Sequence, residues 1–203
     1  MHRTYNRRTA MCVKGGAVKR SNRHQLSGLR GYTLDRRSPV RGYNHVVTKR
    51  DVQAFIDLIP DWSDLSRKIE RIVLASSDDC DGEYVTYKDD LSTILLYAWP
   101  SDLWTELSLR YFEDHWWLLE ELKVVNDAPV GDAVLCRFNR DQARAFMLLH
   151  VFLHELGHHH DRLVRAADRS TSGEEYAERF ANERFHAMYP DSCRVFGDPA
   201  AVR

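Results

Sequence analysis

Hydrophobic residues follow a helical spacing from about residue 48 onward. Thr48 and Asp51 can form a reciprocal N-cap pair, and Pro60 marks the position where the helix should end. Between them, apolar residues recur at helical intervals, namely Val52, Phe55, Ile56 and Ile59. The pattern predicts one helix here and a second, short helix over residues 61–69.

A change to β-branched and apolar runs then predicts strands. The predicted strands are residues 71–75, 83–87, 93–99 and 133–138. An acidic turn at residues 78–82 separates the first two, and residues 127–132 form a predicted loop before the last. Residues 103–125 are expected to be helical in part.

The most apolar helix is predicted after Asn139, with Gln142 as its reciprocal capping partner. Its apolar residues cover more than one side of the helix: Ala143, Phe146, Met147, Leu149, Val151, Phe152 and Leu153. Such a helix lies inside a domain rather than on its surface. Strands followed by a buried helix predict an α+β fold, in which one mixed or antiparallel sheet packs on this helix.

Composition adds a basic N-terminal segment to this picture. The chain has 203 residues, enough for one domain of ordinary size with a packed core. Residues 1–50 hold 13 Lys and Arg residues and a single acid, Asp35. Residues 1–45 show no sustained periodicity, so we expect a flexible basic arm before a domain that spans residues 46–203. The arm could contact nucleic acid or another anionic partner.

The cysteines and the apolar runs bear on the cellular setting. The four cysteines are widely separated and form no CxxC pair, which favours a reducing, cytoplasmic environment. The N-terminus lacks the apolar core of a secretory signal, and the longest apolar runs are too short to span a bilayer. We therefore expect a cytoplasmic protein that does not enter the membrane.

A metal-binding pattern lies on the long apolar helix, where His154, Glu155 and His158 form an HExxH motif. Histidines four apart lie on the same helical face, about 6 Å apart along the axis, so both imidazoles can reach one zinc ion. Glu155 follows the first histidine and can act on a water that the zinc activates. The motif predicts Zn²⁺ as cofactor and Glu155 as the catalytic base.

This segment resembles the active-site helix of the zincin metallopeptidases. Val151 stands three residues before the first histidine, where that family often has Val or Thr. His160 departs from the pattern, because a hydrophobic residue is more usual at its position. The resemblance covers about residues 140–185. It implies a small zincin-like domain that hydrolyses amide bonds in a peptide or protein substrate, with Glu155 as general base.

A catalytic zinc needs a third protein ligand and one open position. Metzincins place a third histidine six residues after the second, and that position is Val164. A deformylase-like cysteine ligand would lie in a glycine-containing motif that the surroundings of Cys136 lack. The gluzincin arrangement, which uses a glutamate on the next helix, therefore remains.

The next helix is predicted over residues 171–189, between a capping pair of Ser172 and Glu175 and a stop at Pro190. Its apolar stripe consists of Ala177, Phe180, Ala181, Phe185 and Met188. Glu174 continues this stripe by one step of three residues, so we predict Glu174 as the third zinc ligand.

Other polar residues crowd the same region. Glu178 and then Asp161 remain alternatives for the third ligand, and either could instead support a ligand histidine from behind. The gluzincin resemblance implies that orienting role for Glu178. His159 and His160 are expected to be exposed near the end of the helix.

A rival hypothesis comes from a different functional class. It is a non-catalytic protein that holds zinc for structural reasons and whose basic arm contacts nucleic acid or a protein partner. Glu155 argues against it, because a structural site has no use for a base beside its ligand. A structural site is also closed, and removal of its metal should unfold the domain.

Overall fold

The computed structural model describes residues 13–14, 17–18, 31–76, 81–86, 91–164 and 173–201. The chain divides into two compact units, Met1–Arg30 and Gly31–Arg203. The described part of the first unit is a short antiparallel pair, β1 (Val13–Lys14) and β2 (Ala17–Val18). Most of the predicted flexible arm lies outside the described residues.

The second unit begins at Gly31, which is earlier than the boundary predicted at residue 46. The reason is a strand that the sequence pattern did not indicate, β3 (Thr33–Arg36), which pairs in parallel with β5 (Ile69–Ala75). Apart from Leu34 its residues are polar, so β3 lacks the apolar run of a strand. Its pairing with β5 places it in the sheet.

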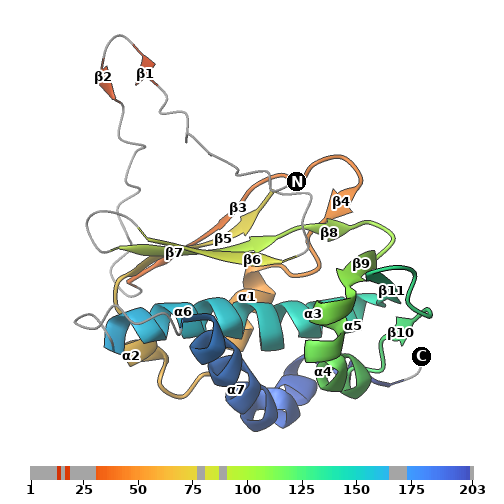
Figure 1. Ribbon diagram of the computed structural model, residues 1–203. Coiled ribbons are helices and arrows are strands. Elements are labelled where there is room, and N and C mark those ends of the chain that lie inside the picture. The colour runs from red at the N-terminus through yellow and green to blue at the C-terminus, as the bar shows by residue number, and fades with distance from the viewer. Residues whose placement is uncertain are drawn as a thin grey trace. The chain divides into compact units, whose positions relative to one another are not determined.

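The main sheet has four strands in the order β3-β5-β7-β6. β7 (Ser92–Tyr97) runs parallel to β5, whereas β6 (Gly82–Thr86) is an edge strand antiparallel to β7 (Figure 1). Three of the predicted strands are therefore present and form a mixed sheet. On β5, Ile72 and Leu74 belong to the main core, while Val73 packs against Tyr97 in a smaller cluster. Burial of both faces explains the continuous apolar runs.

Short helices and strands connect the sheet to the site. α1 (Lys49–Ile56) has the predicted capping box, and α2 (Trp62–Leu65) is the second short helix. Residues 103–125 are partly helical as predicted, with α3 (Leu109–Asp114) and α4 (Trp116–Glu121), but they begin as a strand. That strand, β9 (Trp104–Ser108), lies in a three-stranded sheet of order β10-β11-β9, with β10 (Val125–Asn126) and β11 (Ala133–Arg137). A separate two-stranded sheet pairs β4 (Tyr43–Asn44) with β8 (Trp99–Pro100).

One long helical run lies against the sheet (Figure 1). It comprises α5 (Arg140–Phe146), a π-helical segment η1 (Met147–Phe152) and α6 (Leu153–Val164). The predicted capping box starts it, because Asn139 and Gln142 exchange hydrogen bonds of 2.7 and 2.9 Å. All residues of η1 are buried. The fold is therefore α+β with a mixed sheet packed on a buried helix, as predicted.

The last helix, α7 (Gly173–Phe196), crosses α6 and runs past Pro190, so the predicted stop at this proline is wrong. A proline removes one helical hydrogen bond, but contacts beyond it hold the final turns in place. Arg144 donates to the carbonyl of Phe196 at 2.7 Å, and Gly197, with φ +86°, ends the helix. The predicted cap at Ser172 lies outside the described residues.

Among the described residues, none of the helices combines the length and the apolarity needed to cross a lipid bilayer.

An ion pair between Asp61 and Arg184 links the start of α2 to α7. The guanidinium donates two hydrogen bonds, of 2.9 and 2.6 Å, to the two carboxylate oxygens. These hydrogen bonds lower the pKa of Asp61 below its ordinary value of 3.8, against the opposing effect of burial. Because the folded-state pKa is the lower one, the pair stabilises the fold at neutral pH, and this contribution is lost as pH falls below 3.8.

We predict that Asp61→Asn lowers the free energy of unfolding at pH 7 by at most about 1 kcal/mol, since the pair is partly exposed. The difference from the wild-type chain should shrink as the pH falls through the acidic range. Urea titrations at several pH values measure both effects. Asp64→Asn on α2 is the matched charge control, and an equal loss in that variant would contradict a specific role for the ion pair.

Candidate metal centre

The two motif histidines lie on one face of α6. Their Nε2 atoms are 3.1 Å apart, so both rings direct this nitrogen to the same point. The spacing of four residues produces this arrangement, because such residues lie one above the other on a helix. Both side chains are mostly buried, with exposed fractions of 15% for His154 and 23% for His158.

Glu174 approaches the same point from the start of α7. Its Oε1 lies 3.1 Å from Nε2 of His154, and its Oε2 lies 3.4 Å from Nε2 of His158. Ligand atoms at the corners of a zinc tetrahedron are about 3.3 Å apart, given bonds of about 2.0–2.1 Å. The structure therefore brings the three predicted ligands together at spacings that fit zinc.

Glu178 lies behind His154 rather than beside the shared point. The Nδ1 atom of His154 is 3.2 Å from Oε2 of Glu178 and, as the donor of this hydrogen bond, carries the proton. This leaves Nε2 as the nitrogen that can bind a metal, which is the usual effect of a carboxylate behind a ligand histidine. The geometry thus favours Glu174 as third ligand and an orienting role for Glu178.

Asp161, the remaining alternative, lies near the other histidine. A Cβ atom on Gly173 would be 3.9 Å from both Oδ2 of Asp161 and Nδ1 of His158. The charge of Asp161 acts to raise the pKa of His158, although burial and the neighbouring His154 outweigh it and the pKa is lowered. Asp161 thus lies near the start of α7, and it is not among the described residues whose ligand atoms meet at the shared point.

A close contact between α6 and α7 positions these glutamates. A Cβ atom on Gly157 would lie 2.8 Å from Cα of Ala177 and 3.0 Å from its carbonyl oxygen. The two helices therefore touch backbone to backbone, and any larger residue at 157 would push them apart. Glu174 and Glu178 flank Ala177 on α7, so this contact sets their distance from the histidines.

Glu155 is buried between α6 and the edge strand β6. Its exposed fraction is 6%, and a Cβ atom on Gly82 would lie only 2.9 Å from its Cγ and 3.1 Å from its Oε1. Burial raises the pKa of Glu155 to about 7, nearby carboxylates add to the shift, and His154 opposes it. A carboxyl group with a pKa near neutrality can both accept and return a proton.

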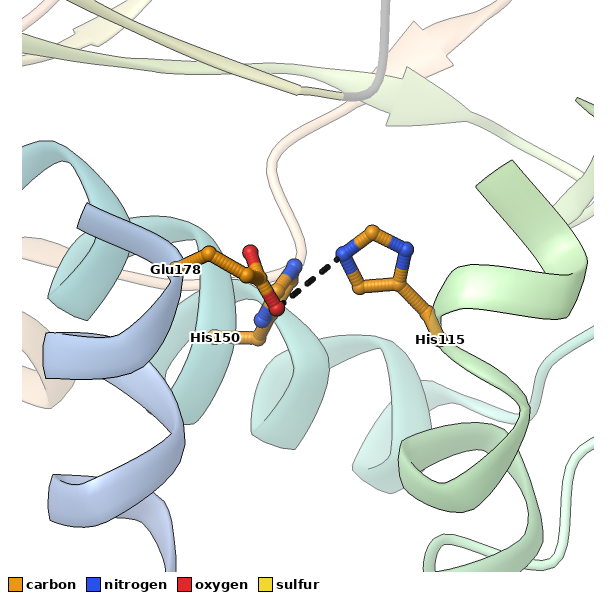
Figure 2. Close-up of side chains that lie close together, drawn as sticks. All are labelled: His115, His150 and Glu178. Carbon is orange, nitrogen blue, oxygen red and sulfur yellow. Dashed lines mark ion pairs between the residues drawn. The ribbon is translucent and has the colours of Figure 1, made fainter. Parts of the chain in front are cut away.

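A second group of metal-binding residue types lies next to the first and consists of His115, His150 and Glu178 (Figure 2). One donor atom from each lies within 4.8 Å of the others. His115 occupies the junction of α3 and α4, and His150 lies in η1. His150 could be noticed in the sequence because it precedes His154 by four residues. His115 has no such signal, since only the fold brings it near.

The expected exposure of His159 is wrong. This residue is buried, with an exposed fraction of 1%, because its side chain on α6 faces Arg67, just after α2, and Tyr84 on β6. Its Nε2 donates to the carbonyl of Arg67 at 2.8 Å, so its Nδ1 accepts a hydrogen bond of 3.2 Å from the hydroxyl of Tyr84. His160 is half-buried and contacts the hydroxyl of Tyr176 at 2.7 Å. Both histidines attach α6 to its neighbours.

Comparison of the chain with protein-family models, with curated proteins and with solved structures finds no match. The function is therefore inferred from the arrangement of the residues themselves.

We predict that Gly157→Ala weakens zinc binding at least about tenfold, because the added methyl group displaces α7 and the glutamate that it carries. Overpacking should also lower the free energy of unfolding by about 1–3 kcal/mol. Zinc competition with a chelating dye and urea unfolding measure the two effects. Gly31→Ala is the control, since nothing lies within 4 Å of its added Cβ. Unchanged zinc affinity in Gly157→Ala would contradict the role assigned to the helix contact.

Proposed function

We propose that this chain is a zinc-dependent hydrolase that cleaves peptide bonds. In this proposal His154, His158 and Glu174 bind the zinc, and Glu155 is the general base. The observation that carries it is the approach of three ligand atoms to one point at 3.1–3.4 Å, beside a buried carboxyl group of raised pKa. The resemblance of the motif to zincin metallopeptidases agrees with this assignment.

The donor set favours a catalytic rather than a structural zinc. Structural zinc sites are closed by four protein ligands, most often cysteines, whereas two histidines and a glutamate leave a position for water or substrate. The side chain of Glu174 is 80% exposed, so solvent and substrate can reach this side of the site. Glu155 gives the site a proton acceptor, which a structural zinc would not require.

The roles of the side chains follow from their positions. Zinc, when bound, would supply a Lewis acid that polarises the substrate carbonyl and lowers the pKa of a water. Glu155 takes the proton from the attacking water and later delivers a proton to the leaving amine. Glu178 holds the Nδ1 proton of His154, so the ring of His154 stays in one tautomer and orientation.

The edge strand β6 supports a peptide as the substrate. Of the described strands β6 pairs only with β7, and its Gly82 contacts the base Glu155. An edge strand presents backbone groups that an extended peptide can pair with, and such pairing gives affinity with little dependence on sequence. A peptide added along β6 would pass beside Glu155 and the two histidines.

We predict that the purified chain, supplied with zinc, binds one zinc ion. His154→Ala and Glu174→Ala should lose most of it, because each removes one of three ligands. Glu155→Gln should keep it. Elemental analysis after desalting measures the metal content. If the wild-type chain binds no zinc, the proposal is wrong, and if Glu174→Ala retains zinc fully, another carboxylate is the third ligand.

We predict that Gly82→Ala keeps its zinc but lowers peptide cleavage about 100-fold, because the new methyl group displaces Glu155 from β6. Mass spectrometry of a diverse synthetic peptide library, incubated with each variant, measures cleavage. Glu155→Gln is the inactive reference, and Gly31→Ala is the matched glycine control. Wild-type activity in Gly82→Ala would contradict the position assigned to the base.

A further inference from the structure

Glu178 is held from two sides by two different parts of the chain. Its Oε2 accepts a hydrogen bond from Nδ1 of His154 on α6. Its Oε1 lies 3.4 Å from Nε2 of His115, at the junction of α3 and α4 (Figure 2). A single carboxylate thus connects a predicted zinc ligand to a histidine that precedes it by 39 residues in the sequence.

His115 is itself fixed in orientation. Its Nδ1 is 2.8 Å from the carbonyl oxygen of Tyr111 and therefore carries a proton. Its ring stacks on the ring of Tyr111, with centroids 3.9 Å apart and an angle of 19° between the planes. With Nδ1 committed to the carbonyl, Nε2 can donate to Glu178 only if His115 is an imidazolium. The negative charge of Glu178, 3.4 Å from Nε2, favours this charged form of His115.

His115 and Glu178 each shift the pKa of the other toward its charged form. Burial acts to lower the pKa of His115, but the hydrogen bonds to Glu178 and to the carbonyl of Tyr111 outweigh it and the pKa is raised. Burial alone would raise the pKa of Glu178, yet His115 and His154 hold it well below its usual range. His150, whose pKa burial lowers to about 3, stays neutral, with its Nε2 3.2 Å from the hydroxyl of Tyr111.

We propose that His115 is a positioning residue of the metal centre, which acts by holding Glu178 against His154. This inference rests on the proposed function only in taking His154 as a zinc ligand. A free glutamate side chain could turn away from His154, whereas a carboxylate held at both oxygens has one position. His115 thereby fixes the ring of His154 with Nε2 directed at the zinc, and partners of this kind contribute about 10- to 100-fold to metal affinity.

A second metal ion is the competing interpretation of this group, because two histidines and a glutamate are metal ligands. The contacts favour a proton, rather than a metal ion, between His115 and Glu178. Nδ1 of His115 is used by a carbonyl, Nε2 of His150 faces a hydroxyl, and one oxygen of Glu178 is used by His154. The ion pair accounts for the remaining nitrogen of His115 and the remaining oxygen of Glu178.

Two substitutions of His115 in the full chain test this inference. His115→Phe keeps a flat ring on Tyr111 but removes the donor, whereas His115→Gln supplies an amide N–H that can reach Glu178. His186→Phe is the control, because it makes the same exchange at an exposed histidine on α7. Zinc affinity is measured by competition with a chelating dye, together with stoichiometry, thermal unfolding and the visible spectrum of the cobalt(II)-loaded chain.

We expect His115→Phe to weaken zinc binding about tenfold and to alter the cobalt spectrum. His115→Gln should restore both to near wild type, and His186→Phe should change neither. Equal affinity in all variants would overturn the inference, even if zinc binding and peptide cleavage by the wild-type chain uphold the proposed function. Two zinc ions in the wild type and one in His115→Phe would overturn it in favour of a second metal site.

A positioning effect is distinguished from general destabilisation by the pair of His115 variants. If His115→Phe and His115→Gln lose thermal stability and zinc affinity to the same extent, the role of His115 is structural and the inference is wrong. None of these measurements needs a substrate. A chain that binds zinc as expected but cleaves no peptide would therefore remove the peptidase proposal and leave the role of His115 standing.

Discussion

The backbone contact between Gly157 and Ala177 is the constraint on which the candidate site depends. It brings α6 and α7 so close that no side chain fits between them at this point. Glu174 and Glu178 are one helical turn apart on α7, and the contact places them at the two ends of the His154 ring. Loss of this proximity would separate both carboxylates from the ring at once, even with His154, Glu155 and His158 unchanged.

The site uses the two nitrogens of His154 for different purposes. Nε2 faces His158 and Glu174, where a cation would bind. Nδ1 carries a proton and donates it in a hydrogen bond to Glu178. Beyond Glu178 lies the positive charge of His115. With a cation bound at the proposed metal centre, charges would alternate in sign from His115 through Glu178 to that cation, and each would stabilise the next in its charged form.

Features that depend on neighbouring residues could be predicted from the sequence. The capping pairs of Thr48 and Asn139, the histidine spacing and the orientation of Glu174 all follow from helical geometry. Features that depend on distant residues could not be predicted. β3 forms because β5 is beside it, the final turns of α7 are held by Arg144 despite Pro190, and the buried surroundings of His159 come from other elements. The contact of His115 with Glu178 also depends on distant residues and could not be predicted.

The π-helical segment has a consequence for how this chain should be compared with others. A π-turn holds about one residue more than an α-turn, so Met147–Phe152 amounts to an insertion inside a continuous helix. Removing one residue there would rotate α5 by about 100° relative to α6 and move the cap at Asn139 away from its present contacts. A related chain without the π-turn would be one residue shorter at this point. The correct alignment gap would then fall within a helix, where insertions and deletions are least expected. An alignment that places the gap in the nearest loop instead would shift every residue between that loop and the π-turn by one position.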